Sequence, residues 1–105
     1  MTTKDLLEKA RELISDPARW TKGAVARDLN GEPIEEFSSD AVCFCSIGVV
    51  SSVANCLGLF NSTTHLLDRC AGKRGYPNIL SFNDAPTTTH EDIVSLFQEA
   101  INDAS

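Results

Sequence analysis

The chain has 105 residues, of which 42% are hydrophobic and 23% are charged, and its formal net charge is −6. This composition is typical of a soluble globular protein and differs from the polar, charge-rich composition of disordered chains. The nine Lys and Arg residues are scattered along the chain, and nucleic-acid affinity depends on clustered cations, so we expect no direct binding of DNA or RNA. The length predicts a single compact domain over residues 1–105.

The N-terminal residues lack the long apolar segment of a signal peptide, and no stretch reaches the roughly 20 apolar residues of a membrane span. We therefore expect a cytoplasmic protein that makes no membrane contact. Structural disulfides are not expected in a reducing cytosol. The four cysteines are accordingly predicted to be free thiols.

The first predicted element is a helix in "TTKDLLEKARELIS", where apolar residues recur at helical spacing. Thr2 and Asp5 have the spacing of a capping box at its start. Asp16 before Pro17 predicts a second N-cap, followed by a short turn that leads to Trp20. A single Trp is most often an anchor in the core, and we interpret Trp20 in this way.

Residues 23–37, "GAVARDLNGEPIEEF", alternate between short apolar and polar segments. The Asn30–Gly31 pair is a strong hairpin signal. We expect a small two-stranded ribbon or an irregular hairpin that packs one face on the helices.

The apolar run that follows predicts a central helix. Ser38 or Ser39 would cap this helix, with Asp40 in its first turn, where a negative charge suits the helix dipole. The helix would continue to about Leu57 and stop at Gly58. Because apolar residues occur on nearly all of its sides, we expect the other helices to surround it.

The last third of the chain predicts two more helices. The first, "TTHLLDRCA", would be capped by Asn61 or Ser62 and ended by Gly72. The second would begin at Thr89, which has Asp92 three residues later in a capping box. Between them, "NILSF" is compatible with a short helical turn and with a short extended segment.

These elements predict a mainly α fold. We expect a compact helical domain of about four helices around a central apolar helix, with a small β-hairpin or irregular ribbon near residues 23–37.

The cysteines are more consistent with packing than with a site. On a helix, Cys43 and Cys45 would point to opposite faces, and Cys45 and Cys56 would lie roughly 16 Å apart along the axis. We interpret the thiols as small buried hydrophobic groups and expect no cofactor and no metal site. Metal binding through Cys70 and a histidine remains an alternative. Cys43, as the cysteine nearest a predicted helix start, would be a poor nucleophile beside an acidic residue.

Six residues are candidates for binding a ligand or a partner: Trp20, Arg27, Asp28, Asn83, Asp84 and His90. If they converged beside the central helix, they would form a pocket in which Arg27 could bind a carboxylate or phosphate. In the alternative interpretation, Asn83 and Asp84 make side-chain turns, and Arg27 pairs with Asp28 to orient the ribbon. The sequence contains no Gly-rich phosphate loop and no "GxSxG" or "HExxH" motif, so a catalytic role is disfavoured.

The pattern "DPARWTKGAVARDLNGEPI…DAVCFCSIGVV…FNDAPTTTHEDIVSLFQEAI" resembles a family of small bacterial and bacteriophage proteins classed as a domain of unknown function. The chain matches the family pattern at Trp20, Ala26 to Asp28, Gly31, Cys45, Asn83 to Pro86, Thr89 and His90. It departs at Phe44 and Phe82, where the family has Trp, which indicates packing roles at both positions. The resemblance covers most of the chain. It implies a shared compact fold and a phage or mobile-element setting, and it implies no particular activity.

The acidic charge and the missing catalytic motifs favour a small acidic, non-enzymatic binding or inhibitor protein of bacterial or phage origin. It would act by contact with a protein partner that has a basic surface, such as a nucleic-acid-processing complex. The alternative is a small-molecule binder or minor enzyme with a pocket formed by Trp20, Arg27, Asn83, Asp84 and His90.

Overall fold

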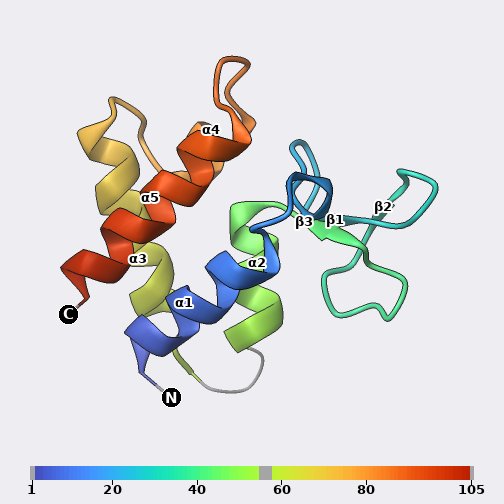
Figure 1. Cartoon of the computed structure of the whole chain (residues 1–105), viewed down its shortest axis with the longest axis horizontal. Helices are drawn as coiled ribbons and strands as arrows, with labels where there is room; N and C mark the ends of the chain where they lie inside the picture. Colours follow the sequence, from blue (N-terminus) through green and yellow to red (C-terminus); the bar gives the residue numbers. More distant parts are fainter. Residues whose placement is uncertain (1, 55–57, 105) are drawn as a thin grey trace.

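The computed structural model describes residues 2–54 and 58–104, and helices make up most of them (Figure 1). The helices are α1 (Thr3–Leu13), the short 3-10 helix η1 (Pro17–Arg19), α2 (Ser46–Ala54), α3 (Phe60–Lys73), α4 (Ile79–Asp84) and α5 (His90–Asp103). The strands are β1 (Ala26–Arg27), β2 (Pro33–Ile34) and β3 (Cys43–Phe44), which form one antiparallel sheet in the order β2-β1-β3. The predicted mainly α fold with a small ribbon is confirmed.

The core lies between α1, α2, α3 and α5, and α4 packs against α2 and α3 and adds Ile79 and Phe82 to it. Leu6, Val49, Leu67 and Phe97, one from each of the four longer helices, are fully buried. No residue of α2 is exposed, as expected for a helix that its neighbours surround. Burial of each large apolar side chain contributes about 1.5–3 kcal/mol to stability. None of the helices within residues 2–54 and 58–104 is both long enough and apolar enough to cross a membrane.

The helix starts that were predicted from local capping signals are confirmed. Thr2 Oγ1 accepts a hydrogen bond from the Asp5 amide at 3.2 Å, and the Thr2 amide donates to the Asp5 carboxylate at 3.0 Å. Thr89 and Asp92 form the same capping box at the start of α5. Asp16 caps η1 by accepting from the Ala18 amide at 3.0 Å. Each of these caps satisfies amides that the helix itself leaves without partners.

The prediction that the central helix begins at Ser38 or Ser39 is wrong. The helix begins eight residues after Ser38, at Ser46, because the intervening residues turn and then pair as β3 with β1. The amides on both sides of β3 find acceptors in the ribbon: Val42 donates to Arg27 O at 2.9 Å and Cys45 donates to Val25 O at 3.1 Å. The predicted helix end at Leu57 lies outside the described residues.

The predicted boundaries of α3 are also wrong by a few residues. The helix begins after Leu59, which makes no side-chain cap, rather than after Asn61 or Ser62. It continues through Gly72, and the left-handed backbone that favours glycine occurs instead at Gly75, whose φ is 89°. At the start of the helix, Thr63 Oγ1 donates to Leu59 O at 2.7 Å, so a buried hydroxyl stabilises the first turn.

The segment "NILSF" is helical. Asn78 Oδ1 accepts from the Ser81 amide at 2.8 Å and caps α4 locally. Asp68 of α3 accepts from the Ile79 amide at 2.9 Å and adds a tertiary cap. This long-range cap is one reason that the local sequence leaves the conformation of the segment undecided.

The segment that precedes β1 approaches the backbone of α2 closely at Gly48. A Cβ atom at this position would lie 1.9 Å from Val25 O, which is inside the sum of the atomic radii. Gly48 therefore sets the distance between α2 and the segment that precedes β1.

Substitution of Gly48→Ala should lower the free energy of unfolding by about 3 kcal/mol, because the new methyl group overlaps a backbone carbonyl. Gly72→Ala is the matched control, since Gly72 is also helical and a Cβ atom added there would have nothing within 4 Å. The control should leave stability unchanged or raise it by up to about 1 kcal/mol. Urea denaturation of both variants measures the difference, and equal effects would contradict the close approach.

Candidate functional site

Three of the predicted site residues meet in one hydrogen-bonded group around Asn83, which is fully buried near the end of α4. Asn83 Oδ1 accepts from Trp20 Nε1 at 2.7 Å, from the Ser46 amide at 3.0 Å and from Ser46 Oγ at 2.7 Å. Its Nδ2 group donates to Thr21 O at 3.1 Å and to Asp84 Oδ1 at 2.9 Å. The amide thus joins the start of α2, the end of α4 and the segment that follows η1. We call Trp20, Thr21, Ser46, Asn83 and Asp84 the Asn83 cluster.

Arg27 holds the ribbon to the segment that follows Trp20. All three nitrogen atoms of its guanidinium group donate hydrogen bonds. Nε donates to Thr21 Oγ1 at 3.0 Å, Nη1 donates to Gly31 O at 3.0 Å, and Nη2 donates to Lys22 O at 2.9 Å. One side chain therefore links the turn between β1 and β2 to the residues that follow Trp20. The geometry resembles a clamp within the chain rather than an open anion site.

Asp28 lies apart from this group and closes the turn of the ribbon. Its Oδ1 accepts from the amides of Asn30 at 2.9 Å and Glu32 at 3.0 Å. The alternative interpretation paired Asp28 with Arg27, but the ion pairs found in the described part of the chain involve Lys73 and Arg74 only. Asp28 instead stabilises the turn by accepting local amide hydrogen bonds.

Asp84 and His90 complete the surroundings of Trp20. Asp84 Oδ1 also accepts from the Gly23 amide at 3.0 Å. His90 is the first residue of α5, and its ring is half-buried and donates from Nε2 to Ile14 O at 2.6 Å. The His90 ring lies 6.0 Å from the Trp20 ring, centroid to centroid.

The structure thus brings Trp20, Arg27, Asn83, Asp84 and His90 around residues 20–23 and leaves Asp28 at the ribbon turn. Their polar atoms bond to groups of the chain itself. Within the described residues, no buried side-chain nitrogen or oxygen lacks a hydrogen-bond partner. The direct chemical consequence of this arrangement is to anchor the base of the ribbon to the helices.

The three described cysteines, Cys43, Cys45 and Cys70, are free thiols. Cys45, not Cys43, lies at the start of α2, where its Sγ accepts from the Gly48 amide at 3.2 Å. Burial raises the pKa of the Cys45 thiol, and the hydrogen bonds from α2 amides only partly oppose this effect. Because the reactive form of cysteine is the thiolate, Cys45 is a poor nucleophile. The predicted separation of Cys45 from Cys56 involves a residue outside the described part of the chain.

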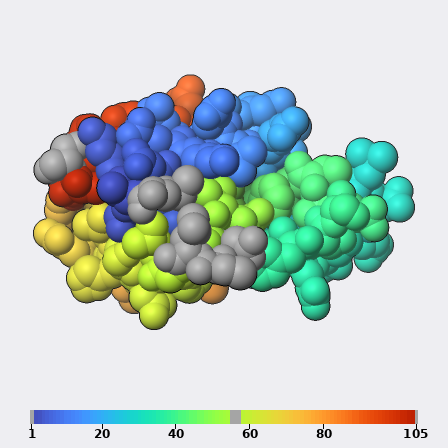
Figure 2. All heavy atoms as spheres, turned by 90° about the horizontal axis from the view of Figure 1, so that it is seen from below, coloured from blue at the N-terminus to red at the C-terminus, as the bar shows by residue number. Residues whose placement is uncertain are grey.

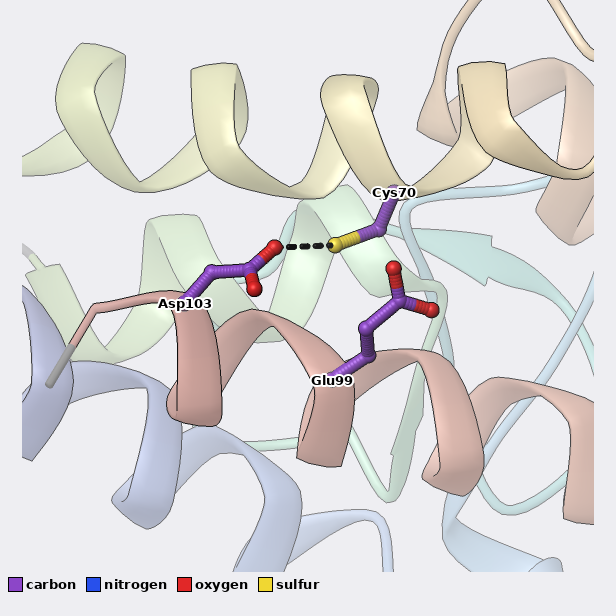
Figure 3. Close-up of side chains that lie close together, drawn as sticks. All are labelled: Cys70, Glu99 and Asp103. Atoms are coloured by element: carbon purple, nitrogen blue, oxygen red, sulfur yellow. Dashed lines mark hydrogen bonds between the residues drawn. The ribbon is translucent and has the colours of Figure 1, made fainter.

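Cys70 lies between two helices beside a pair of carboxylates (Figure 3). Its Sγ donates to Asp103 Oδ2 at 3.7 Å, and one ligand atom from each of Cys70, Glu99 and Asp103 lies within 4.8 Å of the others. The histidine of the alternative metal site is not part of this group, which is the one such group in the described chain.

The two carboxylates beside Cys70 are already bonded to cations of α3 and its C-cap. Lys73 Nζ lies 3.2 Å from Glu99 Oε2 and 3.2 Å from Asp103 Oδ2, and Arg74 Nη1 lies 2.6 Å from Glu99 Oε1. Burial opposes ionisation of Glu99, but the Arg74 and Lys73 hydrogen bonds outweigh it and lower its pKa. The group therefore acts as an ion-pair network that joins α3 to α5.

Residues 28–42 form a surface of a different kind, which we call the ribbon surface. It contains five of the fifteen acidic residues and none of the nine basic residues, so the rest of the chain has ten acidic and nine basic residues. The acidic residues are Asp28, Glu32, Glu35, Glu36 and Asp40. Nearly all of the net charge of −6 therefore belongs to one short segment. The net charge of the whole chain does not reveal this surface, whereas a count of charge by segment would have found it.

The ribbon surface also exposes large apolar side chains. Leu29 is 86% exposed and Phe37 is 60% exposed, and Val42 and the neighbouring Val25 are partly exposed. Outside the ribbon, Leu80 on α4 is the large hydrophobic residue of the described chain that is similarly exposed. Leu29 and Val42 lie close together, since both line the same two hollows, and exposed apolar groups that are surrounded by polar residues are typical of a binding surface.

Substitution of Asn83→Asp should lower the free energy of unfolding by about 3 kcal/mol, because an acceptor would replace the two donors that face Thr21 O and Asp84. The same substitution at Asn61, which is exposed in the first turn of α3, is the control. Asn61→Asp should change stability by less than about 1 kcal/mol. Chemical denaturation followed by Trp20 fluorescence provides the measurement. A similar small effect at both positions would show that the Asn83 hydrogen bonds do not stabilise the fold.

Burial raises the pKa of the Cys70 thiol from its ordinary value of 9.0 to about 11, and Glu99 and Asp103 add to the rise. Between pH 9.0 and about pH 11, the Cys70 thiol therefore keeps its proton in the native protein and loses it in the unfolded chain. The contribution of Cys70 to stability should therefore be complete below pH 9.0 and decline as the pH rises toward 11.

Cys70→Ala should remove this part of the alkaline decline, whereas Cys43→Ala should retain it. Urea denaturation of the wild type and both variants at about pH 8 and about pH 10.5 tests the expectation. The same decline in the wild type and in Cys70→Ala would rule out the Cys70 contribution.

Comparisons with known proteins identify a family but no activity. Neither the curated proteins nor the solved structures give a match to the chain. Residues 1–103 match DUF6197, a family of unknown function. The match covers nearly the whole chain, and the chain therefore belongs to the DUF6197 family.

Proposed function

We propose that the protein is a non-enzymatic binding domain whose ribbon surface contacts a protein partner with a basic surface. The observation that carries this proposal is the concentration of charge: residues 28–42 have five acidic side chains and no Lys or Arg. A field of one sign attracts a surface of the opposite sign and accelerates the encounter. The remaining residues have nearly balanced charge and would contribute little to this attraction.

The shape of the molecule supports the same role. The ribbon surface forms one end of the molecule, beyond the helices, in the space-filling view (Figure 2). Its base is held by Arg27 and the Asn83 cluster, so little ordering would be required when a partner binds. A binding surface that is already ordered loses less entropy on association.

The thiols favour binding over catalysis. Cys45 and Cys70 are both buried, and the pKa of each is raised. In the bacterial or phage setting that the sequence resemblance implies, the domain would act by occupying a basic surface of its partner. A groove of a nucleic-acid-processing complex has the required charge, and occupation of such a groove would inhibit the complex.

Charge reversal on the ribbon tests the proposal. The variant Glu32→Lys/Glu35→Lys changes two exposed side chains of the ribbon surface, and Glu8→Lys/Glu12→Lys makes the same charge change on exposed residues of α1. Immobilised wild type and both variants would be exposed to host lysate at low salt. A basic partner identified by mass spectrometry would then be purified and its binding measured directly.

We expect the ribbon variant to bind this partner at least about tenfold more weakly, while the α1 variant binds within about threefold of the wild type. Increasing salt should weaken wild-type binding. An equal loss of affinity in both double variants would indicate a general charge effect and would contradict the assignment of the binding site to the ribbon surface. Circular dichroism should show the same fold in all three proteins.

A further inference from the structure

The ribbon surface has a ridge with a hollow on each side. Leu29 and Val42 line both hollows. The first hollow, of about 400 Å³, is also lined by Asp28 and Asp40. The second, of about 410 Å³, is also lined by Asp16 and Phe44. We call Leu29 and Val42 the ridge.

The ridge is apolar and open to solvent. Leu29 is 86% exposed and Val42 is 42% exposed. Covering a leucine side chain that was fully exposed to water strengthens binding by roughly tenfold to a hundredfold. Leu29 is thus the side chain of this surface that has most to gain from a partner, and its position between two hollows lets a partner contact it from both sides.

Carboxylates lie at both hollows, and they restrict the kind of partner. Asp28 and Asp40 line the first hollow with no basic residue, whereas Arg19 balances Asp16 in the second, so the charge that favours a cation lies at the first hollow. Asp28 Oδ1 and Asp16 Oδ1 accept hydrogen bonds from backbone amides, which hold these side chains in place. An aliphatic side chain that contacts the ridge would therefore be best accompanied by a Lys or Arg at the first hollow, beside Asp28 and Asp40. Nucleic acids and anionic membranes have the wrong charge for this surface.

We propose that the ridge binds a polypeptide segment in which aliphatic side chains, placed on both sides of Leu29, alternate with lysine or arginine. This inference rests on the proposed function, because it specifies the partner of the same surface. The attraction would come from the five carboxylates of the ribbon surface. The apolar ridge would add affinity and would select among basic segments.

Synthetic peptides serve as probes of this specificity. The first is a fluorescein-labelled peptide of alternating lysine and leucine, and the second has serine in place of every leucine. Fluorescence anisotropy would measure the binding of each peptide to the wild type. We expect the lysine–leucine peptide to bind at least about tenfold more tightly than the lysine–serine peptide, because only the former can cover the ridge.

Leu29→Ser removes the more exposed side chain of the ridge, and Leu80→Ser removes an exposed leucine from α4 as the matched control. Both side chains are exposed, so neither substitution opens a cavity in the core. Leu29→Ser should weaken binding of the lysine–leucine peptide about tenfold and leave the lysine–serine peptide unaffected. Leu80→Ser should bind both peptides as the wild type does.

Equal binding of the lysine–leucine peptide by Leu29→Ser and Leu80→Ser would overturn the ridge proposal. If Glu32→Lys/Glu35→Lys still lost affinity for the basic partner, the proposed function would stand without the ridge. If that variant kept full affinity for both the partner and the peptides, the proposed function itself would fail. The leucine variants and the charge-reversal variants therefore separate the apolar contribution to binding affinity from the electrostatic contribution.

Discussion

The arrangement of this protein depends on one buried amide. Asn83 is fully buried and makes five hydrogen bonds, four of them to two distant segments and one to its neighbour Asp84. Burial of an amide is unfavourable unless its donors and acceptors are matched, and a matched group is worth most where water is excluded. Because the partners include the first amide of α2 and the backbone of Thr21, the same amide positions a helix and the entry to the ribbon.

The two parts that Asn83 joins are stabilised by different forces. The helices are held by apolar burial from α1 to α5, and the network of Lys73, Arg74, Glu99 and Asp103 adds ion pairs at one edge of α3 and α5. The ribbon is held mainly by backbone pairing, by Arg27 and by the Asp28 turn. Because the ribbon is held mainly by hydrogen bonds, Leu29 can stay exposed to solvent without loss of the fold. The side chain is therefore available to a partner.

The candidate residues and the proposed binding surface therefore have complementary roles. Trp20, Arg27, Asn83, Asp84 and His90 lie at the base of the ribbon and bond to the chain, whereas the acidic and apolar residues 28–42 extend beyond it. The thiols have a third role. Cys45 accepts an amide hydrogen bond at the start of α2 and Cys70 packs between α3 and α5, and both are protonated because their surroundings disfavour the thiolate.

The elements whose signals are local could be predicted from the amino-acid sequence: the capping boxes at Thr2 and Thr89, the turn at Asp16, and the hairpin at Asn30–Gly31. The sequence also singled out Trp20 and Asn83, although not their bond to each other. The strand at Cys43–Phe44 and the start of α2 at Ser46 became evident only in the folded chain. Both depend on hydrogen bonds to residues 25–27 and to Asn83. Local spacing cannot encode such bonds, because the partners are distant along the chain and meet only after it has folded.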